Sequence, residues 1–137
     1  MKVLELFAGT RSISRAFEAR GHQTYSIEWD RSFPDIDLYA DVLTVTAEQI
    51  LRDFGRPDVI WASPDCSTYS IAAISHHRRR EENGNLSPVS DYAKFCDRVN
   101  LHVHGLIVAL SPRFWFIENP RGGCGRWTSC LDCQDTQ

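Results

Sequence analysis

The sequence predicts an α/β fold with a mostly parallel sheet of about five strands. Short apolar runs alternate with stretches in which apolar residues recur every three or four positions, the pattern of strand–helix units. The chain has 137 residues, of which 42% are apolar and 24% charged. These values are typical of one globular domain, which commonly has about 100–150 residues, and they exclude a second complete domain.

The first half of the chain contains three predicted strands and one helix. Ile13, Ala16 and Phe17 share one helical face, and Gly21 is a natural C-terminal cap for that helix. Pro34 interrupts the stretch before a very short third strand. The predicted strands are residues 2–7, 23–28 and 38–40.

The second half begins with a capping box, Thr46 followed by Gln49, which predicts a helix closed by Gly55. A longer helix is predicted from Ser87-Pro88 to Pro112 because its apolar residues keep helical spacing. The remaining predictions are strands at 58–62 and 114–117, the latter buried on both faces, a long loop at 63–86 and an irregular tail at 121–137.

Chemically useful side chains follow each predicted strand, at the sheet edge where ligands of open parallel sheets bind. Gly9 permits a tight turn whose free amides can face an anionic or zwitterionic ligand. Glu28 lies about 20 residues further on, where an acid can bind ribose hydroxyls. Trp29 can stack on a nucleobase or lie partly in the core, and Asp41 can bind an adenine amino group or cap a turn.

The ordered motifs resemble those of DNA (cytosine-5) methyltransferases of bacterial or phage type. The likeness covers residues 3–120 and rests on Leu6-Phe7-Ala8-Gly9, Glu28-Trp29-Asp30, Cys66 after a proline, and Glu118-Asn119. It implies a Rossmann-like, S-adenosylmethionine-dependent methyltransferase fold that is C-terminally shortened. Residues 1–120 are then a partial catalytic domain, and residues 121–137 remain a tail.

The resemblance also implies the chemistry of the site. Cys66 is the expected nucleophile at carbon 6 of a flipped cytosine in DNA, Glu118 the group at ring nitrogen 3, and Asn119 a support for the backbone. S-adenosylmethionine is the expected cofactor, and no metal is expected. The residues expected to hold the cofactor are Phe7, Ala8, Gly9, Thr10, Glu28, Trp29, Asp41, Val42 and Pro64.

Three departures from the family pattern stand out. Arg11 and Ser12 replace a glycine pair in the cofactor turn, and Asp65 replaces the proline before Cys66. A carboxylate at position 65 is expected to raise the pKa of the thiol, which then needs positive potential from elsewhere. No Arg-x-Arg segment follows Pro120. The chain is therefore either a shortened member or one completed by a partner subunit or its own copies, because the sheet edge would otherwise stay uncovered.

Three other functions fit parts of the sequence. The segment Ser63-Pro64-Asp65-Cys66 is an altered form of the signature of enzymes that methylate exocyclic nitrogens, although it lacks their aromatic residue. A tRNA cytosine-5 methyltransferase has nearly identical motifs. A non-catalytic remnant that binds cofactor or a partner is the alternative from another class.

Charge and cysteine content set further expectations. The net charge of -3 limits any phosphate contact to a local basic patch. One candidate is the segment His-His-Arg-Arg-Arg at residues 76–80, which is either a solvated loop or a phosphate contact. The loop that carries this segment is expected to close over the flipped base. No apolar run reaches the roughly 18 residues of a membrane span, so a cytoplasmic, reduced protein is expected. Cys124, Cys130 and Cys133 lack an evident fourth zinc ligand.

Overall fold

A five-stranded parallel sheet forms the centre of the computed structural model, which describes residues 1–70 and 72–118. In the strand order β3-β2-β1-β4-β7, β2 and β3 are added on one side of β1, and β4 and β7 on the other. The switch point therefore lies between β1 and β4, as in doubly wound, Rossmann-like sheets. This confirms the α/β class and the parallel pairing. The strands are β1 (Lys2–Leu6), β2 (Gln23–Glu28), β3 (Leu38–Tyr39), β4 (Val59–Ala62) and β7 (Phe114–Ile117).

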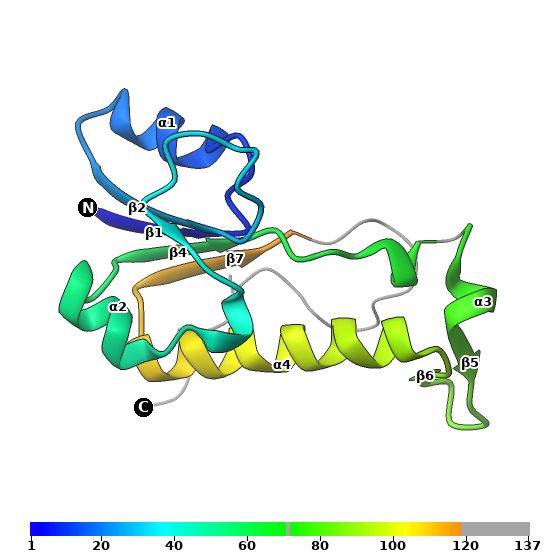
Figure 1. Cartoon of the computed structure of the whole chain (residues 1–137). Helices are drawn as coiled ribbons and strands as arrows, with labels where there is room; N and C mark the ends of the chain where they lie inside the picture. The colour runs from blue at the N-terminus through cyan, green and yellow to red at the C-terminus, as the bar shows by residue number, and fades with distance from the viewer. Residues whose placement is uncertain (71, 119–137) are drawn as a thin grey trace, which may run out of the picture.

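Helices cover the two faces of this sheet unequally (Figure 1). Helix α1 (Ser12–Glu18) lies on one face, and α2 (Ala47–Asp53) and α4 (Asp91–Leu110) lie on the other. The main core forms between the sheet and α4, because the apolar residues of that helix recur on one side of it. Its centre includes Leu4, Leu6 and Ile60 of the sheet and Val103 and Leu110 of α4.

A buried acid in β1 determines how α1 begins. Glu5 is only 3% exposed, and its carboxylate accepts hydrogen bonds from the amides of Ile13 and Ser14 at 3.3 and 2.8 Å and from the Ser14 hydroxyl at 2.5 Å. These are orphan amides of the first helical turn, which lacks a side-chain cap of its own. Glu5 therefore supplies the cap from a neighbouring element.

The two helices of the other face have their own caps. Thr46 accepts a hydrogen bond from the amide of Gln49 at 3.1 Å, which confirms the predicted start of α2. Helix α4 begins later than predicted, at Asp91, because Ser90 caps it and the preceding residues form strand β6 (Leu86–Pro88). Within the described part of the chain, no helix combines the length and apolarity that crossing a membrane requires.

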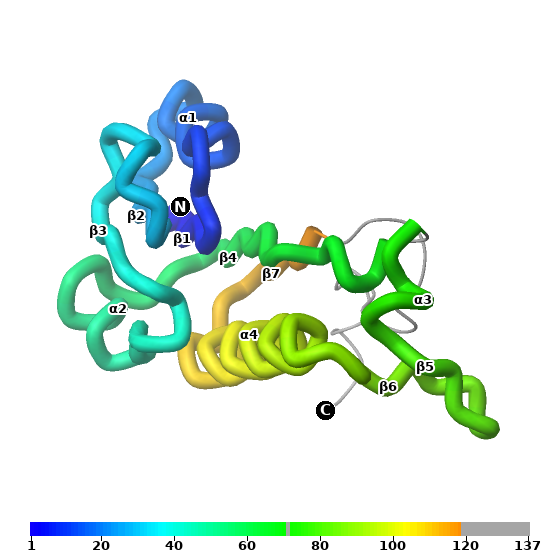
Figure 2. The backbone as a smooth tube through the Cα atoms, turned by 45° about the vertical axis from the view of Figure 1, so that its right-hand side comes forward, coloured from blue at the N-terminus to red at the C-terminus, as the bar shows by residue number. Residues whose placement is uncertain are grey.

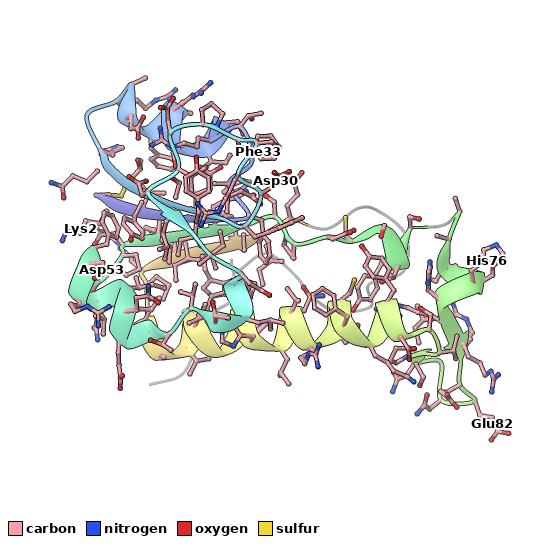
Figure 3. All side chains as sticks on the ribbon, in the orientation of Figure 1. Lys2, Asp30, Phe33, Asp53, His76 and Glu82 are labelled. Carbon is pink, nitrogen blue, oxygen red and sulfur yellow. The ribbon has the colours of Figure 1, made fainter. Side chains whose placement is uncertain are left out.

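The predicted loop at 63–86 is in fact a series of short elements. It contains a 3-10 turn (Ser67–Tyr69), a one-turn helix α3 (Ile74–His77) and strand β5 (Arg78–Arg80), which pairs antiparallel with β6. Figure 2 shows this hairpin projecting beyond the sheet at one end of α4. His76 and Glu82 lie at that end of the molecule and Asp53 at the other (Figure 3).

Strand β7 differs from the prediction on one face. Trp115 and Ile117 pack against the core, but Phe114 and Phe116 are 42% and 37% exposed. Phe116 contacts the ring of Trp61 on β4, with 5.1 Å between centroids. The expectation of burial on both faces is wrong because, among the described elements, the helix on this side of the sheet packs on β1 and β2.

Candidate cofactor and catalytic site

A cavity of about 420 Å³ lies beyond the carboxyl ends of β1, β2 and β3, with α4 forming another wall. Its volume is within the range of about 300–1,000 Å³ typical of small-molecule sites. The position is the one expected for a ligand of a doubly wound sheet. The lining residues are Phe7, Ile27, Glu28, Trp29, Ala40, Asp41, Val42, Asp65, Tyr92, Phe95, Cys96 and Val99.

The carboxylate of Glu28 is held rigidly at one end of the cavity. It is 7% exposed and accepts hydrogen bonds from three backbone amides: Gly9 at 2.9 Å, Trp29 at 3.0 Å and Asp30 at 3.1 Å. A carboxylate has about four lone-pair directions, so roughly one stays free for a ligand hydroxyl. The fold thus presents a fixed acceptor at the end of β2.

The turn after β1 adopts the expected tight geometry but does not leave its amides free. Gly9 has a φ of +50°, which favours glycine. Its amide is nevertheless bonded to Glu28, and the first amides of α1 are bonded to Glu5. For Gly9, Ile13 and Ser14, the prediction of free amides that face an anionic or zwitterionic ligand is therefore wrong, because Glu28 and Glu5 already accept their hydrogen bonds.

Trp29 and Asp41 lie at the wall of this cavity. Trp29 is 70% exposed, which excludes a place in the core and leaves its ring open to stacking. Asp41 caps a 3-10 turn (Val42–Thr44), since its side chain accepts a hydrogen bond from the amide of Leu43 at 3.0 Å. It therefore caps a turn, one of its two expected roles, and also lines the cavity.

Phe7 and Val42 line the cavity as predicted, whereas the remaining sequence-predicted cofactor residues, which are Ala8, Gly9, Thr10 and Pro64, do not. Ala8 and Pro64 are buried, Gly9 forms the turn and Thr10 is exposed. Arg11 links α1 to β2 through hydrogen bonds to Ser26 at 3.2 Å and Glu18 at 2.5 Å. Asn119, Cys124, Cys130 and Cys133 lie outside the described residues.

Glu118 is positioned by the pairing of β4 with β7. Its amide donates to the carbonyl of Ala62 at 2.9 Å, which continues the strand register. The hydroxyl of Ser63 donates to the Glu118 carboxylate at 3.0 Å and accepts from the indole nitrogen of Trp61 at 3.2 Å. This chain of hydrogen bonds orients the exposed carboxyl group beside the segment that carries Cys66.

Cys66 itself lies next to the cavity, immediately after the lining residue Asp65. Burial, the Asp65 carboxylate and the Glu118 carboxylate together raise the pKa of its thiol. Asp65 therefore raises the pKa of the thiol as predicted, and no cation among the described residues lowers this pKa. The isolated site keeps Cys66 as a thiol at neutral pH.

A buried arginine fixes the turn that follows Cys66. Arg78 is 5% exposed and binds both carboxylate oxygens of Asp97 on α4, at 2.5 and 3.2 Å. It also donates to the hydroxyl of Thr68 at 3.1 Å and lies 3.6 Å from the ring centroid of Tyr69. The prediction of a phosphate contact is therefore wrong for Arg78, although Arg79 and Arg80 are exposed.

Helix α4 supplies four lining residues that sequence reasoning did not assign to the site: Tyr92, Phe95, Cys96 and Val99. Tyr92, Cys96 and Val99 lie on the apolar face whose helical spacing predicts this helix, and that spacing alone does not distinguish the core from a cavity wall. Phe95 is off that face and 41% exposed, which marks it as a wall residue. The position of this large aromatic residue outside the apolar face was the one feature of the sequence that indicated a residue of the cavity wall.

Comparison with known proteins adds a relative. No model of a known protein family matches the chain. A protein of Frog virus 3 (isolate Goorha), named as a probable DNA (cytosine-5)-methyltransferase, is 30% identical over 135 residues. This match covers 90% of the chain, which spans 55% of the length of that relative.

Among solved structures, a UDP-glucuronic acid 4-epimerase of Bacillus cereus in complex with NAD is 12% identical, with a TM-score of 0.45. The match covers 90% of this chain and 59% of the epimerase. The viral relative, together with the ordered motifs, supports placing this chain in the DNA (cytosine-5)-methyltransferase family.

Proposed function

We propose that the cavity binds S-adenosylmethionine and that the chain is the catalytic part of an enzyme that methylates carbon 5 of cytosine in DNA. One observation carries the proposal. A single cavity connects Glu28, suited to a ribose, with Asp65, the residue directly before the nucleophile candidate Cys66. A cofactor bound at Glu28 can therefore extend to the place where the base is expected.

The charges of the cavity favour this cofactor over a dinucleotide. Among residues 1–70 and 72–118, its lining contains the carboxyl groups of Glu28, Asp41 and Asp65 and no lysine, arginine or histidine. S-adenosylmethionine carries a positively charged sulfur, whereas NAD carries an anionic pyrophosphate. The amides at the start of α1, which hold pyrophosphate in dinucleotide-binding folds, are bonded to Glu5.

The ribose and the adenine of the cofactor have candidate partners. Glu28 would accept a hydrogen bond from a ribose hydroxyl, Trp29 would stack on the adenine, and Asp41 would accept from the adenine amino group. Phe7 and Val42 supply apolar walls. When bound, the cofactor supplies a methyl group that is electrophilic because it is attached to a positively charged sulfur.

The substrate chemistry uses Cys66 and Glu118. The sulfur of Cys66 adds to carbon 6 of cytosine, while the carboxyl group of Glu118 keeps a proton on ring nitrogen 3. This addition makes carbon 5 nucleophilic. Carbon 5 then bonds to the methyl carbon as the bond between that carbon and the cofactor sulfur breaks. Transfer of the carbon 5 proton to solvent finally restores the ring double bond and breaks the bond between carbon 6 and the sulfur of Cys66. The base must leave the duplex to reach these groups.

Regions beyond this site complete the proposed enzyme. Arg79 and Arg80 of the projecting hairpin are exposed and can contact phosphates, although Glu81 and Glu82 beside them limit the local positive charge. The chain spans 55% of its viral relative. Reading of a target sequence by a partner subunit or a second copy of this chain is part of the proposal.

A covalent-trapping assay tests the proposed catalysis. Incubation with S-adenosylmethionine and duplex DNA containing 5-fluorocytosine should yield an adduct that survives a denaturing gel, because fluorine at carbon 5 blocks the final elimination. Peptide mapping should locate the DNA at Cys66, and Cys66→Ser should form no adduct. Duplex with ordinary cytosine and reactions without cofactor serve as controls.

Two outcomes would count against this reading. A protein that binds the cofactor but yields no adduct is a non-catalytic remnant, which rejects the proposed catalysis. An adduct that forms with fluorinated tRNA and not with duplex DNA would replace the proposed substrate. Circular dichroism of each variant confirms that the protein is folded.

A further inference from the structure

The carboxylate of Asp65 is held at the cavity wall by two donors from different elements. The amide of Ser67 donates to one oxygen at 2.8 Å, and the hydroxyl of Tyr92, on α4, donates to the other. Burial opposes ionisation, but these hydrogen bonds outweigh it and place the pKa of Asp65 below its usual range. The wall therefore carries a fixed negative charge at neutral pH.

This charge lies at the reactive end of the cavity. Glu28 lies at the nucleoside end, and Asp65 directly precedes Cys66. A methyl group that reaches a base held at Cys66 must come from a sulfur at the same end. None of the ion pairs formed between described side chains includes Asp65, so no neighbouring cation neutralises it.

We infer that Asp65 senses the charge of the cofactor, so that the cavity binds S-adenosylmethionine in preference to its product and Cys66 is more reactive when the charged form is bound. This inference rests on the function proposed above. Methyl transfer converts a positive sulfur into a neutral sulfide, and Asp65 then loses its electrostatic partner. The spent cofactor is released for that reason.

The same charge links the cofactor to the nucleophile. Asp65 disfavours the thiolate of Cys66 in the free protein. A positive sulfur beside Asp65 offsets that repulsion, so Cys66 becomes more reactive toward alkylating reagents on binding of S-adenosylmethionine. The neutral product S-adenosylhomocysteine gives no such compensation. The proline usual at this position in the family cannot provide either effect, because it has no charge.

Asp65→Asn tests the inference, since asparagine keeps the shape and an oxygen for Ser67 or Tyr92 but removes the charge. Calorimetry of wild type should show tighter binding of S-adenosylmethionine than of S-adenosylhomocysteine. The ratio of the two dissociation constants should fall about three- to fivefold in the variant, a modest effect because solvent screens the partly exposed Asp65. Asp53→Asn is the matched control, because Asp53 lies at the other end of the molecule (Figure 3).

Alkylation of Cys66, followed by mass spectrometry of its peptide, is the second measurement. In wild type S-adenosylmethionine should accelerate the reaction and S-adenosylhomocysteine should not, whereas Asp65→Asn should react faster without any ligand. Unchanged selectivity in a folded Asp65→Asn that binds the cofactor would overturn the inference and leave the proposed function standing. Failure of folded wild type to bind S-adenosylmethionine would instead reject the proposed function.

Tyr92→Phe gives an independent route if Asp65→Asn does not fold. It removes only the hydroxyl that holds Asp65 from α4. The freed carboxylate should move and be better solvated, so selectivity should shift in the same direction by a smaller amount. Selectivity equal to that of wild type in this variant would contradict a role for a fixed charge.

Discussion

Glu28→Gln should weaken binding of S-adenosylmethionine by about 30- to 100-fold, the loss expected for a charge-assisted hydrogen bond and its supporting contacts. The carboxylate accepts hydrogen bonds from the backbone amides of Gly9, Trp29 and Asp30. A glutamine places an NH₂ group against at least one of these donors, which disrupts the turn after β1. The hydrogen bond to the ribose then weakens together with the shape of the site.

Isothermal titration calorimetry measures this change. Glu48→Gln is the matched control, because it makes the same chemical change at an exposed acid of α2 and should leave the affinity as in wild type. Thermal unfolding without ligand separates lost binding from lost folding. A Glu28→Gln protein that is folded and binds with wild-type affinity would show that Glu28 does not hold the cofactor.

Arg78→Met should lower the free energy of unfolding by about 3 kcal/mol, as expected when one partner of a buried ion pair is removed. The side chain of Arg78 is 2% exposed and binds Asp97, Thr68 and the face of Tyr69. Methionine fills part of the space but leaves the carboxylate of Asp97 without its cation. The turn that follows Cys66 then loses its attachment to α4.

Urea unfolding followed by fluorescence measures this difference. Arg79→Met, one residue further along the same strand, should change stability by less than about 0.5 kcal/mol because Arg79 is exposed. Arg78→Lys should fall between the two, since lysine keeps the charge but cannot bind both oxygens of Asp97. Equal stabilities of the Arg78→Met and Arg79→Met variants would contradict the structural role assigned to Arg78.

The regular part of the fold was predictable because its signals are local. The apolar runs predicted all five strands of the sheet, and the Thr46 cap predicted the start of α2. The hairpin of β5 and β6 was missed although its turn contains Asn83-Gly84, a strong hairpin signal. Its strands are too short and too polar to show an alternating pattern.

The site was predictable only where a residue acts alone at a strand end. Glu28, Trp29 and Asp41 were identified in this way, and all three line the cavity. Arg78 was misread because its partner Asp97 lies 19 residues further along the chain. The amides of α1 were misread because a strand residue, Glu5, occupies them. Such pairings depend on tertiary structure and leave no local pattern.

The central claim is that the cavity holds S-adenosylmethionine, and parallel calorimetric titrations of the wild-type chain with S-adenosylmethionine and NAD test it most directly. The account predicts saturable binding of S-adenosylmethionine and no detectable binding of NAD, because acids line the cavity and Glu5 occupies the amides that pyrophosphate would need. Tighter binding of NAD, or no binding of S-adenosylmethionine by folded protein, would contradict it.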